Sequence, residues 1–81
     1  MRNLAEVVSI RVRQLRHARG WTQEDLADKV GISARYVGYI ERCEGALTVT
    51  VLGRLAEAFG VEPGELLRPQ AGRKTRDARS D

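Results

Sequence analysis

The sequence has a single cysteine, Cys43, among its 81 residues, so an internal disulfide framework is excluded. It also lacks any apolar run near the roughly 20 residues that a membrane-spanning helix needs. Its first residues do not form the uninterrupted apolar stretch of a signal peptide. We therefore expect a soluble, cytoplasmic protein in a reducing compartment, with no membrane contact.

Side chains that catalyse reactions or bind metals are scarce. His17 is the only histidine, and no cysteine or carboxylate cluster accompanies it at the spacing of metal ligands. The chain has no glycine-rich loop of the kind that binds phosphate groups, and no paired-carboxylate site. We therefore expect a protein that is not an enzyme and that carries no metal and no cofactor.

Periodic apolar residues stop after Leu67, and the remaining residues are mainly Pro, Gly, Gln, Ser and charged types. Such a composition is typical of disorder. Residues 68–81 carry five basic and two acidic side chains, whereas residues 1–67 carry nine of each. We predict one folded domain over residues 1–67 and a disordered basic tail over residues 68–81. Charge alone is as consistent with solubility as with nucleic-acid binding.

Apolar residues recur at helical spacing in four longer segments and one short one. The four predicted inner faces are Leu4, Val8, Val12 and Leu15; Leu26, Ala27 and Val30; Val37 and Ile40; and Leu52, Leu55, Ala56 and Phe59. The expected N-caps are Asn3, Thr22, Ser33 and Thr48, and the expected stops are Gly20, Gly31 and Gly60. Pro63 begins the short fifth helix. The fold class is therefore predicted to be all-α, a five-helix bundle.

Two short helices joined by a tight turn are the most informative local feature. The first begins after Thr22, Gly31 permits the sharp turn, and the second begins after Ser33. On the second helix the polar side chains recur at i, i+4 and i+7, opposite the apolar side. These polar residues are Arg35, Tyr39 and Arg42.

The segments LRHARGWTQEDLADKVGIS, YVGYIER and LGRLAEAFGVEPGELL resemble, in this order, the phage repressor/Cro-like (XRE) family of helix-turn-helix regulators. The resemblance covers about residues 8–67. It implies a lambda-repressor-like bundle, with a recognition helix at about residues 33–42, that binds double-stranded DNA as a homodimer and regulates transcription. Repressors, restriction–modification controllers and antitoxins share this frame, and the sequence does not separate them.

The resemblance also assigns roles to individual residues. The residues implied to contact base edges are Ala34, Arg35 and Tyr39, and those implied to contact phosphates are Gln23, Ser33, Tyr36, Arg42 and Arg16. The plainer alternatives are a solvated polar stripe, an ordinary surface position for Gln23 and a capping role alone for Ser33.

An ion pair and a dimer interface are also expected. Arg16 and Glu41 match family positions that form a partly buried ion pair, whose disruption costs several kcal/mol if the site is dry. An exposed pair would contribute under ~1 kcal/mol. The dimer interface is expected around Val61, Leu66 and Leu67.

Three residues depart from the family pattern. Trp21 replaces a smaller apolar residue and is expected in the core or at its rim. Cys43 stands where the family commonly has glycine, and Glu44 lies where a basic or neutral loop residue would help phosphate binding. Glu44 and the neutral body favour a second interpretation, a protein-interaction module of anti-activator or antitoxin type that has lost DNA binding. A redox role for Cys43 is a further hypothesis.

Overall fold

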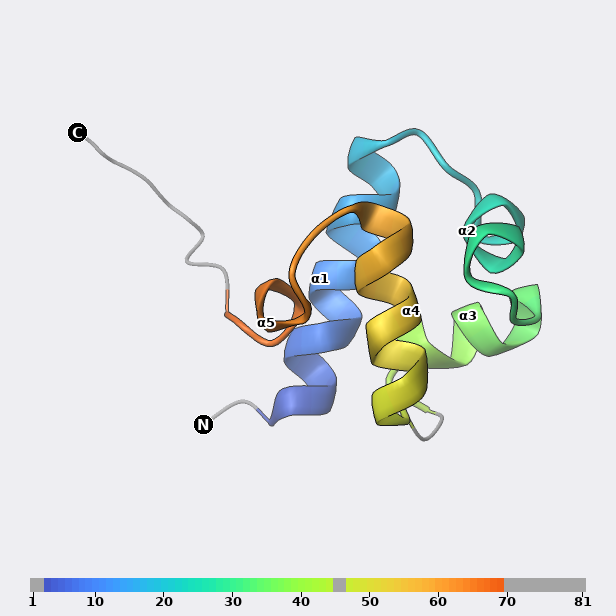
Figure 1. Ribbon diagram of the computed structural model, residues 1–81. Coiled ribbons are helices and arrows are strands. Elements are labelled where there is room, and N and C mark those ends of the chain that lie inside the picture. Colours follow the sequence, from blue (N-terminus) through green and yellow to red (C-terminus); the bar gives the residue numbers. More distant parts are fainter. Residues whose placement is uncertain (1–2, 45–46, 70–81) are drawn as a thin grey trace.

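The computed structural model describes residues 3–44 and 47–69, and this part of the chain folds into five helices without a strand (Figure 1). The helices are α1 (Leu4–Ala18), α2 (Gln23–Val30), α3 (Ala34–Glu41), α4 (Val49–Phe59) and α5 (Pro63–Leu66). The predicted all-α bundle is confirmed. Of the predicted tail, residues 70–81 lie outside the described residues.

Side-chain oxygens at the four expected N-caps determine where the longer helices begin. Each accepts a hydrogen bond from the backbone N–H three residues later, as Ser33 does from Tyr36 at 3.0 Å. At α2 the Asp25 carboxylate also accepts from the Thr22 N–H at 2.9 Å. This completes a reciprocal capping box.

The four longer helices each end at a residue in the left-handed conformation. After α1, α2 and α4 this residue is the predicted glycine, Gly20 (φ 69°), Gly31 (φ 83°) and Gly60 (φ 73°). After α3 it is Cys43 (φ 60°), whose N–H donates to Ile40 O at 3.0 Å while the Glu44 N–H donates to Tyr39 O at 2.8 Å. Cys43 therefore occupies a backbone conformation that favours glycine, the residue that the resemblance implies at this position.

The core lies where α2 and α3 pack against α4 and α1. Its fully buried side chains include Val8, Val12, Leu26, Val37, Leu55 and Leu66. Val37 and Ile40 support α3 from behind, with 0% and 4% exposure, as predicted. Figure 1 shows α2 and α3 together on one side of the bundle and α5 on the other, beside α1.

Two predicted apolar positions differ from the structure. Leu4 is 60% exposed rather than part of the core, because it lies in the first turn of α1. Leu66, predicted at the dimer interface, is 0% exposed. It packs into the chain's own core and cannot face a second subunit. Trp21 lies at the core rim, as predicted, with its ring stacked on Phe59 at a centroid distance of 5.6 Å.

Candidate nucleic-acid interface

The outward side of α3 carries two arginines that share one aromatic ring. The Tyr39 ring centroid lies 5.5 Å from Arg35 Cζ and 5.6 Å from Arg42 Cζ. Arg35 Nε donates to the Tyr39 hydroxyl at 2.6 Å, and Arg42 Nε donates to Glu44 Oε1 at 3.0 Å. These four residues therefore form a connected polar surface opposite the buried side of α3.

The first turn of α3 is less exposed than the sequence suggests. Ala34 and Tyr36 are half-buried and pack against the core cluster, whereas Arg35 is exposed. Ser33 is exposed and caps the helix through the Tyr36 N–H. Of the predicted contact residues in this turn, Ser33 and Arg35 are thus the two that are exposed.

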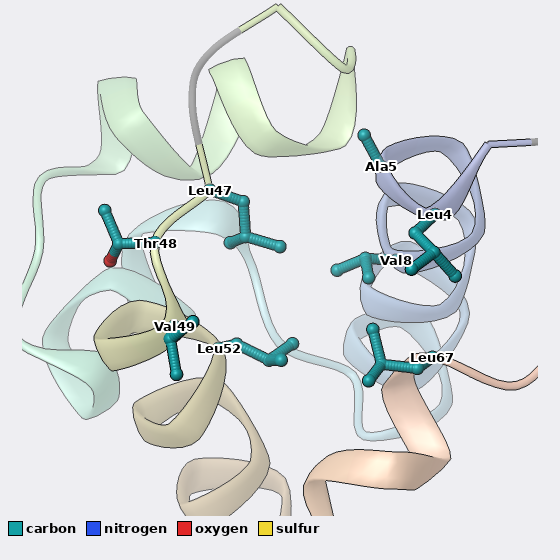
Figure 2. A pocket seen from close by; sticks show the side chains of 8 residues that line it. All are labelled: Leu4, Ala5, Val8, Leu47, Thr48, Val49, Leu52 and Leu67. Atoms are coloured by element: carbon teal, nitrogen blue, oxygen red, sulfur yellow. The ribbon is translucent and has the colours of Figure 1, made fainter.

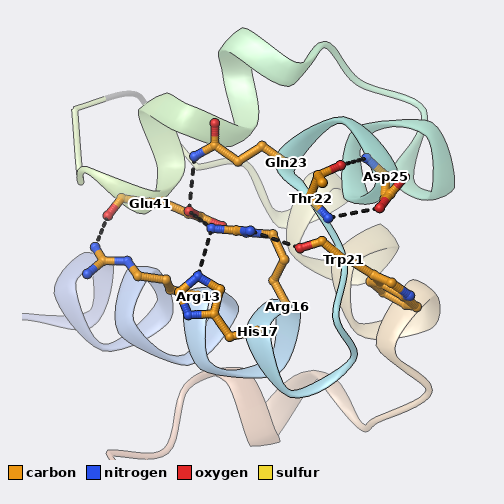
Figure 3. A network of polar contacts seen from close by, with 8 residues as sticks. All are labelled: Arg13, Arg16, His17, Trp21, Thr22, Gln23, Asp25 and Glu41. Carbon is orange, nitrogen blue, oxygen red and sulfur yellow. Dashed lines mark hydrogen bonds and ion pairs between the residues drawn. The ribbon is translucent and has the colours of Figure 1, made fainter.

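A buried carboxylate joins α1, α2 and the end of α3 (Figure 3). Glu41 is only 4% exposed. Its Oε2 accepts from Arg16 Nε at 2.6 Å, and its Oε1 accepts from Arg16 Nη2 at 3.0 Å and from Gln23 Nε2 at 3.1 Å. The ion pair implied by the resemblance is therefore present, and it is buried and bidentate.

The surroundings of Glu41 keep it charged. Burial alone would raise the pKa of Glu41, but hydrogen bonds from Arg16 and Gln23, together with the charges of Arg16 and Arg13, lower it below its ordinary value. The hydrogen bond with Glu41 raises the pKa of Arg16 in turn. Both partners are therefore ionised at neutral pH.

Arg16 is used mainly inside the protein. Besides its two bonds to Glu41, it donates from Nη1 to the Trp21 carbonyl oxygen at 2.9 Å. Its Nη2 also lies 3.2 Å from His17 Nε2, so every nitrogen of the guanidinium has a partner within the protein. Arg13, which the sequence reasoning missed, donates to the Glu41 carbonyl oxygen. Its place one turn before Arg16 on α1 is the signal that could have identified it.

An apolar groove of about 330 Å³ opens between the N-terminal ends of α1 and α4 (Figure 2). Two of its lining residues are strongly exposed, Leu4 at 60% and Val49 at 85%. Leu67, from the predicted dimer surface, lines the same groove, whereas Val61 is half-buried against the core elsewhere. The groove therefore contains both of the large apolar side chains that are exposed among the described residues.

No three His, Cys, Asp or Glu side chains among the described residues gather in a way that could hold a metal ion. Each helix within residues 3–44 and 47–69 is too short or too polar to cross a bilayer.

Comparison with known proteins finds a matching family model and several similar regulatory proteins. A helix-turn-helix family model matches residues 12–66. The Escherichia coli HTH-type transcriptional regulator SutR is 38% identical over 85% of this chain, which spans only 39% of SutR. A hypothetical transcription factor from Neisseria, NHTF, superposes with a TM-score of 0.80 at 33% identity, covering 83% of this chain and 77% of that one. The restriction–modification controller protein C.AhdI from Aeromonas hydrophila superposes with a TM-score of 0.73 at 37% identity. The match covers 76% of this chain and 94% of that one.

Proposed function

Because this chain belongs to the helix-turn-helix family of phage repressor/Cro-like regulators, we propose that it binds double-stranded DNA sequence-specifically and regulates transcription. The observation that carries the proposal is the division of α3 into two sides. Val37 and Ile40 are buried, while Arg35 and Arg42 are exposed on the other side. A helix of this kind fits the major groove, which is wide enough to admit it. We infer that the protein acts by binding and not by catalysis.

The proposed contacts divide into base readers and phosphate ligands. The exposed Arg35 and the half-buried Tyr39 would contact base edges, and the Ala34 methyl group would contact a thymine methyl. Phosphates would meet the N-termini of α2 and α3, where Gln23, Ser33 and Tyr36 lie and where the helix amides favour anions. The bond from Gln23 to Glu41 would hold the Gln23 amide in place for such a contact.

We also propose that the protein binds as a homodimer. One α3 presents only two or three base-reading side chains, too few to select a site among many competing sequences. The open groove with Leu4, Val49 and Leu67 supplies apolar surface for a second subunit. Val61 stays in the predicted interface, and Leu66 does not.

A protein-interaction module is the second candidate function. The observation that favours it is the ion pair between Arg42 and Glu44, 3.0 Å apart, which neutralises one of the two arginines on α3. In that case the α3 surface would bind another protein and show no affinity for DNA.

Site selection from random duplexes, followed by titration at two salt concentrations, separates these functions. We expect a roughly palindromic site and an affinity that falls steeply with salt, because phosphate contacts release counterions. Absence of binding at both salt concentrations would favour the interaction module. A chain ending at Leu67 should keep the selected site, since we propose that residues 1–67 suffice for recognition.

A further inference from the structure

Gly38 lies in the middle of α3 without a conformational reason to be glycine. It is not among the residues with positive φ, and a glycine inside a helix costs about 1 kcal/mol relative to alanine. Its space is occupied by another residue. A Cβ at this position would lie 3.0 Å from Arg42 Nη1 and 3.7 Å from Arg42 Cζ. The Arg42 guanidinium therefore lies on the α3 backbone at the one position where no side chain obstructs it.

Three neighbours hold Arg42 in this place. Gly38 lies beneath the guanidinium, the Tyr39 ring lies beside it at 5.6 Å, and Glu44 Oε1 accepts from Nε at 3.0 Å. Glu44 and Tyr39 thus fold Arg42 back over α3 instead of leaving it extended toward a phosphate. The anchoring bonds of Arg35 and Arg42 both start at Nε. Both bonds leave Nη1 and Nη2 available, and these two nitrogens together can donate to O6 and N7 of a guanine.

We propose that Gly38 is a specificity-determining position, because it leaves room for Arg42 to pack against the Tyr39 ring. Arg35 and Arg42, both held by that ring, would then each contact one guanine of the same half-site. This inference rests on the proposed function. It assigns Arg42 to the base edges, where the resemblance implies a phosphate contact. Gly38 is a positioning residue here, because it acts through Arg42.

The test compares two glycines inside helices. Gly38→Ala adds a methyl group where Arg42 lies, whereas Gly53→Ala adds one on α4 with nothing within 4 Å. Both variants should be at least as stable as the wild type, because alanine favours a helix and Arg42 can swing away. On the duplex selected by the wild type, Gly38→Ala should bind about tenfold or more weakly and lose discrimination at one guanine pair. Gly53→Ala should bind like the wild type.

A double-mutant cycle shows whether the effect passes through Arg42. Arg42→Ala should lose discrimination at the same guanine pair, and adding Gly38→Ala should then change nothing further. Full affinity and discrimination in Gly38→Ala would overturn the inference. So would an additional loss in the Arg42→Ala background, because the new methyl group would then obstruct DNA directly. A wild-type chain that selects no sequence would overturn the proposed function as well, whereas the other two results leave that function intact.

Discussion

At the scale of single residues, Cys43 and Glu41 show how backbone geometry and burial constrain α3. Cys43 holds a left-handed conformation that the equivalent positions after α1 and α4 give to glycine. Glu41 is a buried charge whose carboxylate accepts hydrogen bonds from the side chains of Arg16 on α1 and Gln23 on α2. Both residues act on the position of α3 rather than on DNA.

Replacing Cys43 by glycine should raise the free energy of unfolding by about 1 kcal/mol, because the β-carbon no longer strains the left-handed turn. Urea denaturation measures the change. Cys43→Ala is the control, since it removes the thiol and keeps the β-carbon. An equal gain in both variants would show that the thiol, and not the backbone conformation, is the cause.

Replacing Glu41 by glutamine should lower the free energy of unfolding by about 3 kcal/mol at neutral pH, because Arg16 is left as an unpaired, largely buried charge. The pKa of Glu41 is lower in the folded chain than in the unfolded one. Its stabilisation is therefore complete above the unfolded value of about 4.3 and disappears as the pH falls through the folded pKa. The difference between wild type and variant should stay constant from pH 7 to 5 and shrink below. A difference that persists unchanged to pH 3 would contradict this.

At the scale of helices, local sequence signals determine most of what the structure contains. Capping residues predict the helix starts, and apolar spacing predicts the inner faces, because both depend on neighbours within one or two turns. Leu4 was assigned incorrectly to the buried face of its helix, and the assignment of Leu66 to the dimer interface conflicts with its burial in the core. Whether a residue near a helix end meets a neighbouring helix or solvent depends on tertiary packing, which periodicity does not contain.

The start of α3 allows capping to be separated from phosphate binding. Ser33→Ala should lower the free energy of unfolding by about 1 kcal/mol, because the Tyr36 N–H loses its acceptor. Ser33→Asp should keep the stability, since aspartate is an equally good cap, yet weaken DNA binding by repelling phosphate. Thermal unfolding and duplex titration of the two variants measure these effects. Undiminished affinity in Ser33→Asp would exclude Ser33 from the phosphate contacts.

At the scale of the whole molecule, the open groove connects the monomer to its proposed assembly. Val49→Asp should convert a dimer to a monomer, because it places a charge on the groove without touching the core. Thr50→Asp, at the next and also exposed position of α4, is the matched control. Sedimentation at several concentrations measures the oligomeric state. Identical states in the wild type and Val49→Asp would remove the groove from the interface.

The roles of the arginines were the hardest part to predict from sequence. A long flexible side chain takes its direction from partners that the fold brings to it, such as Glu41, which is 25 residues from Arg16 in the sequence. The family resemblance supplied that one pair. Nothing in the sequence indicated that Arg42 lies over Gly38 or that Arg35 and Arg42 share the Tyr39 ring.

The most direct test of DNA recognition by α3 is the affinity of the Arg35→Ala/Arg42→Ala double variant for the selected duplex. We predict a loss of about a hundredfold or more, because two arginine contacts disappear while Val37 and Ile40 keep the helix in place. Arg54→Ala/Arg68→Ala removes the same charge from exposed positions outside α3 and should bind nearly as well as the wild type. Unchanged affinity in a correctly folded Arg35→Ala/Arg42→Ala protein would contradict the proposed recognition by α3.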